Sequence, residues 1–296
     1  MFKKKSWNIL LDNQSNHDIL SDYLVDYHKN VPFTEIKDDI ILEGNLGNTN
    51  DFNKLMFLLF NQTESNRFKK ISKYVKCMNM KNTNYTTPLM MAAKMAKSEE
   101  SIKILEFVLL NSDKNNINSQ DIDGRSALMY ACANIDTTSS LEACRLLIKN
   151  GSNVDLLDDK GCNSIMIYAL SYTSSNSLPL AKLLLNCNVN IFESSTNNKL
   201  NVLMIACKRY DTTRDIKFIS LLLDSGININ HKDKNGDTVL MQLCKSDIDK
   251  NFDLIKFLID RKAKTDILNN NKESLYDILF SQKSIKKNDI INMILN

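Results

Sequence analysis

A short block of sequence recurs along the chain at a nearly constant spacing, and this period restricts the folds that the chain can adopt. Five copies carry an apolar residue followed directly by methionine, and a weaker sixth copy follows them. The apolar positions are 36 to 39 residues apart and are Leu89, Leu128, Ile165, Leu203, Leu240 and Tyr276. A second apolar block recurs with the same period as the first, from Val108-Leu109-Leu110 to Met293-Ile294-Leu295. Each period therefore predicts two short helices, and neighbouring units must stack to bury a shared core.

Polar connectors join each unit to the next and predict tight turns. Asp121-Ile122-Asp123-Gly124-Arg125 and Asp233-Lys234-Asn235-Gly236-Asp237 are typical. An aspartate side chain accepts hydrogen bonds from nearby backbone amides, and glycine readily adopts positive φ. The repeating unit is therefore predicted to be a turn followed by two helices, and the fold class to be all-α.

The unit resembles the ankyrin repeat, in which a D-x-x-G-x-T-P-L-H-x-A-A stretch precedes a leucine-rich second helix and a G-A-D-V-N-like segment. Thr87-Pro88-Leu89-Met90-Met91-Ala92-Ala93 matches the first stretch. Gly151-Ser152-Asn153-Val154-Asp155 and Gly226-Ile227-Asn228-Ile229-Asn230 match the last. The resemblance implies a solenoid of helix-turn-helix units with short β-hairpin or turn fingers and a concave face lined by the first helices.

The chain departs from the family pattern at one side chain in each unit. Methionine stands where the family usually has histidine, at Met90, Met129, Met166, Met204 and Met241. Thioether packing is therefore expected to replace the histidine hydrogen bonds. This methionine-bearing style, rich in Asn, Lys and Ile, resembles the ankyrin-repeat proteins of giant amoebal DNA viruses, so a viral origin is expected.

The period also exceeds the ~33 residues of the family repeat. The surplus is expected mainly in the turn between the two helices of a unit, in polar segments such as Asp136-Thr137-Thr138-Ser139-Ser140 and Asp211-Thr212-Thr213-Arg214-Asp215. Residues of these types are expected to cap the second helix, because their side-chain oxygens accept hydrogen bonds from helix N-terminal amides.

The stretches at the two ends are expected to close the array, because an end unit has no neighbour to cover it. Within residues 46–81, apolar residues predict one helix around Leu55 and another around Ile71. We predict a degenerate N-capping repeat there, followed by six ankyrin repeats over residues 82–296, of which the last is C-capping.

Residues 1–45 do not share the register of the repeats. Ile19, Leu20 and Tyr23 recur at helical spacing, and Ile40-Ile41-Leu42 forms a second apolar patch after a break at Val31-Pro32. We predict an N-terminal helical extension that caps the array, with the docking of a partner as the alternative. It shows no F-box pattern.

The cysteines favour a reducing, intracellular setting. Their number is seven, which is odd, and they form no C-x-x-C pair, so a disulfide framework or a thiolate zinc site is not expected. The apolar run after Lys3-Lys4-Lys5 is too short for a signal peptide. No stretch approaches the ~18 apolar residues that cross a bilayer. We expect a monomeric protein in the cytoplasm, which could be that of a host cell, with no membrane partner.

No constellation of residues points to catalysis, a metal or a cofactor. Asp121-Ile122-Asp123-Gly124 resembles the start of a calcium loop, but the later ligands and the closing glutamate are missing. Cys132, Cys207 and Cys244 take the place of a small helix residue and are interpreted as core. The three histidines are scattered and there is no phosphate-binding glycine loop. The protein is therefore predicted not to be an enzyme and to bind no cofactor and no metal.

The resemblance implies that a partner binds at the finger tips and at the outward positions that end the first helices. Several of these positions carry Lys or Arg, which favours a positive floor, although exposed charge also serves simply to keep a surface hydrated. The predicted partner-binding residues are Lys94, Met95, Asp123, Arg125, Asn134, Asp159, Lys160, Asn197, Asn198, Lys208, Arg209, Lys234, Asn235 and Lys245.

Three functions are therefore considered. The leading hypothesis is a non-enzymatic scaffold that binds a protein partner on the concave face and the finger tips. The alternative is an adaptor in which residues 1–45 recruit cellular machinery such as a ubiquitin ligase. Nucleic-acid binding is the least favoured, because the net charge is only +3 when 25% of the residues are charged.

Overall fold

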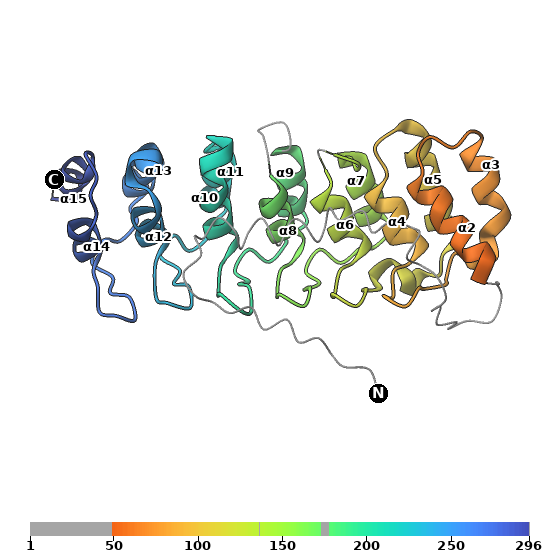
Figure 1. Ribbon diagram of the computed structural model, residues 1–296, viewed down its shortest axis with the longest axis horizontal. Coiled ribbons are helices and arrows are strands. Elements are labelled where there is room, and N and C mark those ends of the chain that lie inside the picture. Colours follow the sequence, from red (N-terminus) through yellow and green to blue (C-terminus); the bar gives the residue numbers. More distant parts are fainter. Residues whose placement is uncertain (1–48, 136, 173–177, 296) are drawn as a thin grey trace.

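A computed structural model describes residues 49–135, 137–172 and 178–295, so the predicted extension at residues 1–45 lies outside the described residues. Within these residues the helices stand in pairs along a single row, with α2 and α3 at one end and α14 and α15 at the other (Figure 1). The loops that join one pair to the next project from the same side of the row (Figure 1). The predicted all-α solenoid is confirmed.

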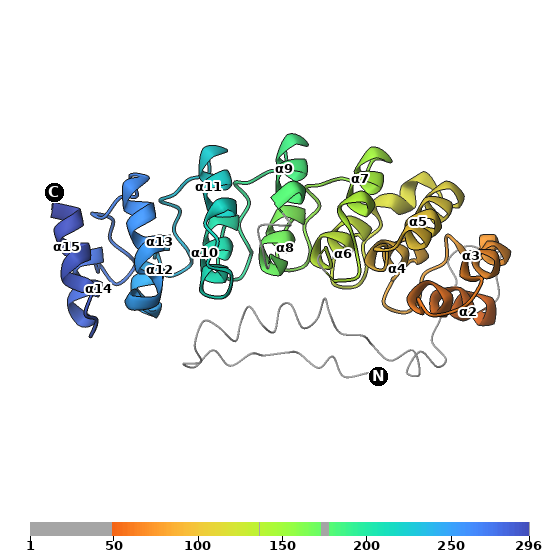
Figure 2. The same ribbon diagram turned by 90° about the horizontal axis from the view of Figure 1, so that it is seen from above.

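Six units, called the first to the sixth below, each contain two helices. The first helices are α4 (Pro88–Lys94), α6 (Ala127–Ala133), α8 (Ser164–Ser171), α10 (Val202–Thr213), α12 (Val239–Ser246) and α14 (Leu275–Ser281). The second helices are α5 (Glu99–Asn111), α7 (Leu141–Lys149), α9 (Leu178–Asn186), α11 (Lys217–Asp224), α13 (Ile248–Asp260) and α15 (Lys287–Leu295). The other helices of the described residues are α2 (Thr49–Phe60), α3 (Arg67–Ile71) and two 3-10 helices, η2 (Ser72–Cys77) and η3 (Lys114–Asn118). Each first helix contacts the next, and the second helices form a parallel layer beside them (Figure 2).

Every first helix begins at a side-chain cap, which sets where the helix starts. The Thr87 and Ser126 hydroxyls accept hydrogen bonds from the backbone amides of Met90 and Met129, at 3.2 and 3.3 Å. The caps of the later units are Asn163, Asn201, Thr238 and Ser274. A cap of this kind stabilises a helix by about 1 kcal/mol, because it pairs an amide that has no partner within the helix.

The five methionines that replace histidine are buried, as predicted, and at most 1% of each is exposed. In the first two units the sulfur also faces the amide of the cap residue. Met90 Sδ lies 3.4 Å from Thr87 N, and Met129 Sδ lies 3.5 Å from Ser126 N. Sulfur is a weak hydrogen-bond acceptor. This side chain therefore fills the core and also accepts a weak hydrogen bond from the backbone amide of the cap residue.

The connectors fold into fingers, each built around one polar side chain, which is Asp or Asn except for Ser195 in the fourth finger. Asp121 Oδ1 accepts hydrogen bonds from the backbone amides of Asp123 and Arg125, at 3.0 and 2.8 Å. Asp158 and Asp233 hold the third and fifth fingers in the same way. These contacts confirm the predicted turns and explain why the connector begins with aspartate.

Neighbouring fingers stack on one another through the backbone. One N–H···O bond of 2.9 to 3.0 Å joins each pair, and the donor and acceptor residues are Ile122 and Asn84, Asp159 and Asp123, Thr196 and Lys160, Lys234 and Asn198, and Asn270 and Asn235. At three of the five contacts a glycine with positive φ follows the acceptor residue, whereas Tyr85 and Lys199 adopt positive φ at the other two. Gly236 has φ of +76°, and a Cβ there would lie 2.7 Å from the backbone nitrogen of Asn270.

The surplus residues of the second unit cap two helices rather than one. Ser140 accepts a hydrogen bond from the amide of Ala143 at 3.2 Å, so the predicted cap of the second helix is confirmed. The Thr138 and Ser139 hydroxyls donate instead to the carbonyls of Lys94 and Ala93, at 2.7 and 2.9 Å. The longer turn therefore also pairs carbonyls at the end of the first helix of the preceding unit, which have no partner within that helix.

The prediction that the surplus lies in a turn is wrong for the fourth unit. There α10 continues to Thr213, so residues 211–213 are helical. The reason is that Tyr210 is buried and extends the apolar face of the helix by another turn. The helix ends at Arg214, whose φ is +50° and whose amide donates to the Tyr210 carbonyl at 2.8 Å.

The stretch predicted to be a capping repeat contains α2, α3 and η2. The helix expected around Leu55 is confirmed, since α2 buries five apolar residues against the row. The helix expected around Ile71 is broken, because Tyr74 has φ of −108° and ψ of 29° and α3 gives way to η2. No helix of the described residues has both the length and the apolar character needed to cross a membrane.

Gly236→Ala is expected to destabilise the array more than Gly226→Ala. Both glycines have positive φ, which costs alanine about 1 kcal/mol, but only a Cβ at position 236 meets backbone of the next finger. We expect losses of about 2–3 kcal/mol for Gly236→Ala and about 1 kcal/mol for Gly226→Ala, measured by urea unfolding. Equal losses would contradict the finger-stacking argument.

Candidate binding surface

The predicted binding residues divide into accessible and buried sets. The exposed residues are Asp123, Asp159, Asn197, Lys234, Asn235 and Lys245, and the half-buried ones are Lys160, Asn198, Lys208 and Arg209. Most of the accessible residues lie on fingers that are joined by the backbone hydrogen bonds described above. The structure therefore brings them together along one edge of the row.

The prediction that four other residues point outward is wrong. Lys94, Met95, Arg125 and Asn134 are only 9%, 8%, 5% and 2% exposed. The long turn of the second unit covers the end of α4, which carries Lys94 and Met95. The Lys94 ammonium lies 5.9 Å from the centre of the Tyr130 ring, and burial lowers its pKa. These side chains stabilise the row and are not available to a partner.

Arg125 and Asn134 are also structural. Arg125 Nη1 lies 3.2 Å from Asp123 Oδ2 within the same finger. The Asn134 carbonyl accepts hydrogen bonds from three amides of the following turn, and its side-chain amide donates to the Tyr130 carbonyl at 2.8 Å. The Tyr130 hydroxyl in turn donates to Asp121 Oδ2 at 2.6 Å, where burial raises the pKa of both groups. This network ties the second finger to α6.

Lys245 is accessible but already paired. Its Nζ lies 2.8 Å from both carboxylate oxygens of Asp237 and 3.6 Å from Glu273 Oε2. Asp237 is only 4% exposed, and Asn269 Nδ2 also donates to it at 2.8 Å. Lys245 therefore neutralises a buried carboxylate between the fifth and sixth fingers, which weakens its predicted role in binding.

Lys208 and Arg209, at adjacent positions on α10, are half-buried cations that form no ion pair with the described residues. Burial lowers the pKa of Lys208, with a smaller opposing effect of Asp233, and Lys208 makes no hydrogen bond or ion pair with the described residues. Burial also lowers the pKa of Arg209. Its Nη2 donates to the Tyr172 carbonyl at 3.4 Å, and its Nε is buried without a partner in the described part of the chain.

We use the name inner surface for the accessible residues around these two cations, which are Asp159, Lys160, Asn197, Asn198, Lys208, Arg209, Lys234 and Asn235. They come from the third, fourth and fifth fingers and from α10. Among common protein groups, the carboxylate is the best binding partner for partly desolvated cations that lie beside backbone and amide donors. No group of three or more His, Cys, Asp and Glu side chains is placed to hold a metal ion in the part of the chain that the structure describes.

A family model described as ankyrin repeats (3 copies) matches the chain at residues 46–158, 89–193 and 165–271. These matches overlap and extend without a gap over most of the sequence. The chain belongs to the ankyrin-repeat family. No curated protein matches it significantly.

Solved structures share the ankyrin fold at low sequence identity. One is the ankyrin repeat domain of Bcl-3, described as a unique member of the IkappaB protein family, with a TM-score of 0.62 and 16% identity over 84% of this chain and 100% of that one. Another comes from the predatory endopeptidase Bd0816 of Bdellovibrio bacteriovorus in complex with the immunity protein Bd3460. Its TM-score is 0.52 at 16% identity, over 73% of this chain and 96% of that one. At this identity the likeness concerns the fold alone.

Sequence reasoning missed one exposed residue of the ankyrin units, Phe192. In other units this slot holds Asp or Asn, whose side chain binds the backbone of the next unit. Asn118 Oδ1 accepts from the Asn153 amide at 2.8 Å, and Asp155 Oδ1 accepts from the Asn190 amide at 2.7 Å. Phe192 makes no such bond and is 69% exposed. An aromatic residue where the register has Asp or Asn was the signal in the sequence, and it marks a candidate anchor for a partner.

Lys208→Met and Lys245→Met are expected to have opposite effects on stability. The first removes a half-buried charge that has no ion pair, and should be neutral or stabilise by up to about 1 kcal/mol. The second leaves the Asp237 carboxylate without its cation, and should destabilise by about 1–2 kcal/mol. Thermal unfolding at neutral pH measures both. A loss of stability in Lys208→Met would show that this charge has a structural partner after all.

Phe192→Asn is expected to stabilise the ankyrin array by about 0.5–1 kcal/mol, because the new amide can accept a hydrogen bond from the backbone of the next unit. Phe192→Ala is the matched control, since it removes the aromatic ring without adding an acceptor. Urea unfolding of the two variants separates the effects. If both variants have the same stability, the slot does not carry the proposed hydrogen bond.

Proposed function

We propose that this protein is a non-enzymatic scaffold whose inner surface binds an acidic segment of a protein partner. Ankyrin repeats generally mediate protein–protein interaction, and this supports the class of function. The observation that carries the proposal is the pair Lys208 and Arg209, which are half-buried on α10 without a carboxylate that pairs with either of them among the described residues.

A protein partner explains this pair better than solvation does. A cation that is only hydrated gains nothing from partial burial, because burial removes water without replacing it. A carboxylate placed against Lys208 or Arg209 would offset that loss and form a charge-assisted hydrogen bond of the kind that gives specificity. The finger residues Lys160, Lys234 and Asn235 would add polar contacts around the same point.

Two other hypotheses lack this support. The adaptor hypothesis depends on residues 1–45, which lie outside the described residues, so it stays a prediction that deletion of those residues would test. Nucleic-acid binding requires a basic track, whereas the accessible fingers carry Asp123 and Asp159 beside their lysines. The viral origin, the monomeric state and the reducing compartment also stay predictions.

Reversing the charge of the inner surface is expected to abolish most of the affinity for the partner. The partner is first identified by affinity capture from the native cell with the full chain. The double variant Lys208→Glu, Arg209→Glu should then weaken binding at least tenfold, because each substitution places a carboxylate against an acidic segment. Titration by calorimetry measures the change.

The matched control is the double variant Lys182→Glu, Lys256→Glu, which makes the same charge change on exposed positions of the second helices α9 and α13. It should bind as well as the wild type. An equal loss of affinity in both double variants would mean that only net charge matters, and would remove the inner surface as the binding site.

A further inference from the structure

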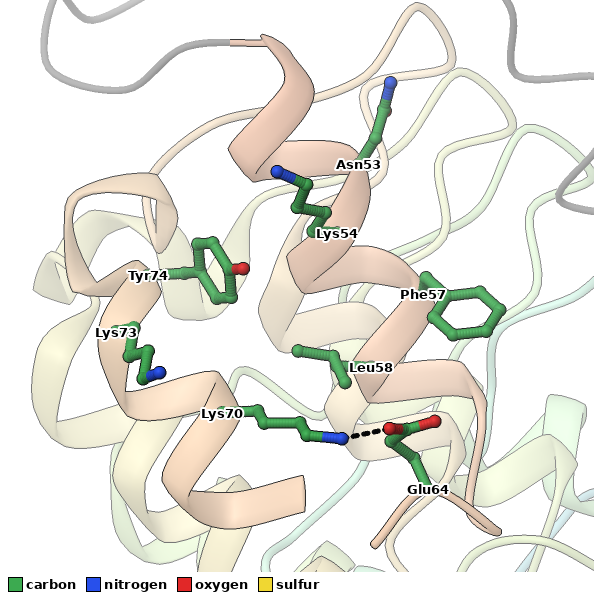
Figure 3. Close-up of a pocket in the computed structure, with 8 residues that line it drawn as sticks. All are labelled: Asn53, Lys54, Phe57, Leu58, Glu64, Lys70, Lys73 and Tyr74. Carbon is green, nitrogen blue, oxygen red and sulfur yellow. Dashed lines mark hydrogen bonds and ion pairs between the residues drawn. The ribbon is translucent and has the colours of Figure 1, made fainter. Parts of the chain in front are cut away.

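A pocket of about 400 Å³ opens at the end of the array that precedes the six units. It lies between α2 on one side and α3 with η2 on the other (Figure 3). Its lining residues are Asn53, Lys54, Phe57, Leu58, Glu64, Lys70, Lys73 and Tyr74. The inner surface is built from other elements, so the pocket serves a separate purpose.

The pocket combines an apolar wall with three lysines, of which Lys70 is paired with Glu64 and Lys54 only loosely with Asp51. Phe57, Leu58 and the Tyr74 ring supply the apolar surface, and the lysines approach from both helical sides (Figure 3). Lys54 Nζ lies 3.9 Å from the nearest carboxylate oxygen, that of Asp51, and Lys73 has no hydrogen bond or ion pair with the described residues.

One polar group of the lining also lacks a partner. The side-chain carbonyl oxygen of Asn53 is buried and accepts no hydrogen bond from the described residues. A ligand that suits this pocket therefore offers apolar side chains, carboxylates for the two lysines and a donor for Asn53.

The charge of the surrounding stretch is strongly positive although the chain is nearly neutral. Residues 49–81 carry seven Lys and Arg and two Asp and Glu, a net +5, whereas the whole chain has a net +3. Residues 12–43 carry eight Asp and Glu and two Lys, a net −6. The two neighbouring stretches are thus opposite in sign, and the acidic one is the nearest large source of carboxylates along the chain.

We propose that residues 38–43, Asp38-Asp39-Ile40-Ile41-Leu42-Glu43, dock into this pocket of the same molecule. The three central apolar residues would cover Phe57, Leu58 and Tyr74, and the flanking carboxylates would pair with Lys54 and Lys73. The sequence order matches the pocket, because one apolar run stands between acidic residues on both sides. A backbone amide of the segment would supply the donor for Asn53.

The length of the intervening chain allows this contact. Six peptide units separate Glu43 from Thr49, the first residue of α2, and they span up to about 20 Å when extended. Lys54 and Leu58 lie five and nine residues into α2, which is about 8 and 14 Å along the helix axis. The segment can therefore turn back along α2, and the short connection gives it a high effective concentration at the pocket.

Hydrogen exchange of the full chain, followed by mass spectrometry, tests the proposal. The amides of residues 38–43 should exchange at least about tenfold more slowly in the wild-type protein than in a free peptide of the same residues. Lys54→Glu, Lys73→Glu should remove this protection. Adding Asp39→Lys and Glu43→Lys to that variant should restore it, because the carboxylates on the two sides of the apolar run are then reversed together with the two lysines.

The control Lys182→Glu, Lys256→Glu should leave the protection unchanged, and slow exchange in α6 and α8 shows that every variant is folded. Three outcomes would overturn the proposal. They are peptide-like exchange of residues 38–43 in the wild type, protection that survives the reversal of Lys54 and Lys73, and protection that rises with protein concentration, which would mean that a second molecule supplies the segment.

Discussion

The close approach of consecutive first helices is the constraint on which the whole array depends. Where one first helix meets the next, the residue six positions after the helix cap is small, namely Ala93, Cys132, Ala169, Cys207 or Cys244, and none is more than 1% exposed. A larger side chain there would force the helices apart, which a close-packed core does not tolerate. In the sixth unit the same slot holds Phe280, which is 67% exposed because no further unit of the described chain covers it.

The same constraint explains three of the free cysteines, Cys132, Cys207 and Cys244. Their thiols serve as small apolar groups between helices, and burial raises the pKa of Cys244 to about 12, so this thiol stays protonated and unreactive. The core is thus built from residues chosen for size. The units also differ in the polar residues of the finger tips, the ends of the first helices and the turns between helices. These variable positions are the ones that could give the array specificity for one partner over another.

Several features of the fold were predictable because each depends on local chemistry repeated in register. A cap such as Thr87 acts on an amide three residues away, and the side chain of Asp121 acts on amides two and four residues away. Such contacts need only the sequence spacing. The candidate site was harder to predict, because exposure depends on what the neighbouring unit places on top of a residue. Lys94 directly follows Ala93 as Lys208 follows Cys207, and Asn134 takes the register position of Arg209, yet the turn at residues 137–140 helps to bury Lys94 and Asn134.

The sequence by itself determined the period, the two helices of each unit, the capped helix starts and the turns of the fingers, because these follow from interactions within about one period of the chain. Only the tertiary structure decided which cations remain available to a partner. Lys245 is neutralised by Asp237 and Lys208 is not, although each directly follows the buried cysteine of a first helix, at the same register position. The distinction depends on distances between side chains of different units, and those distances are set by how the units stack.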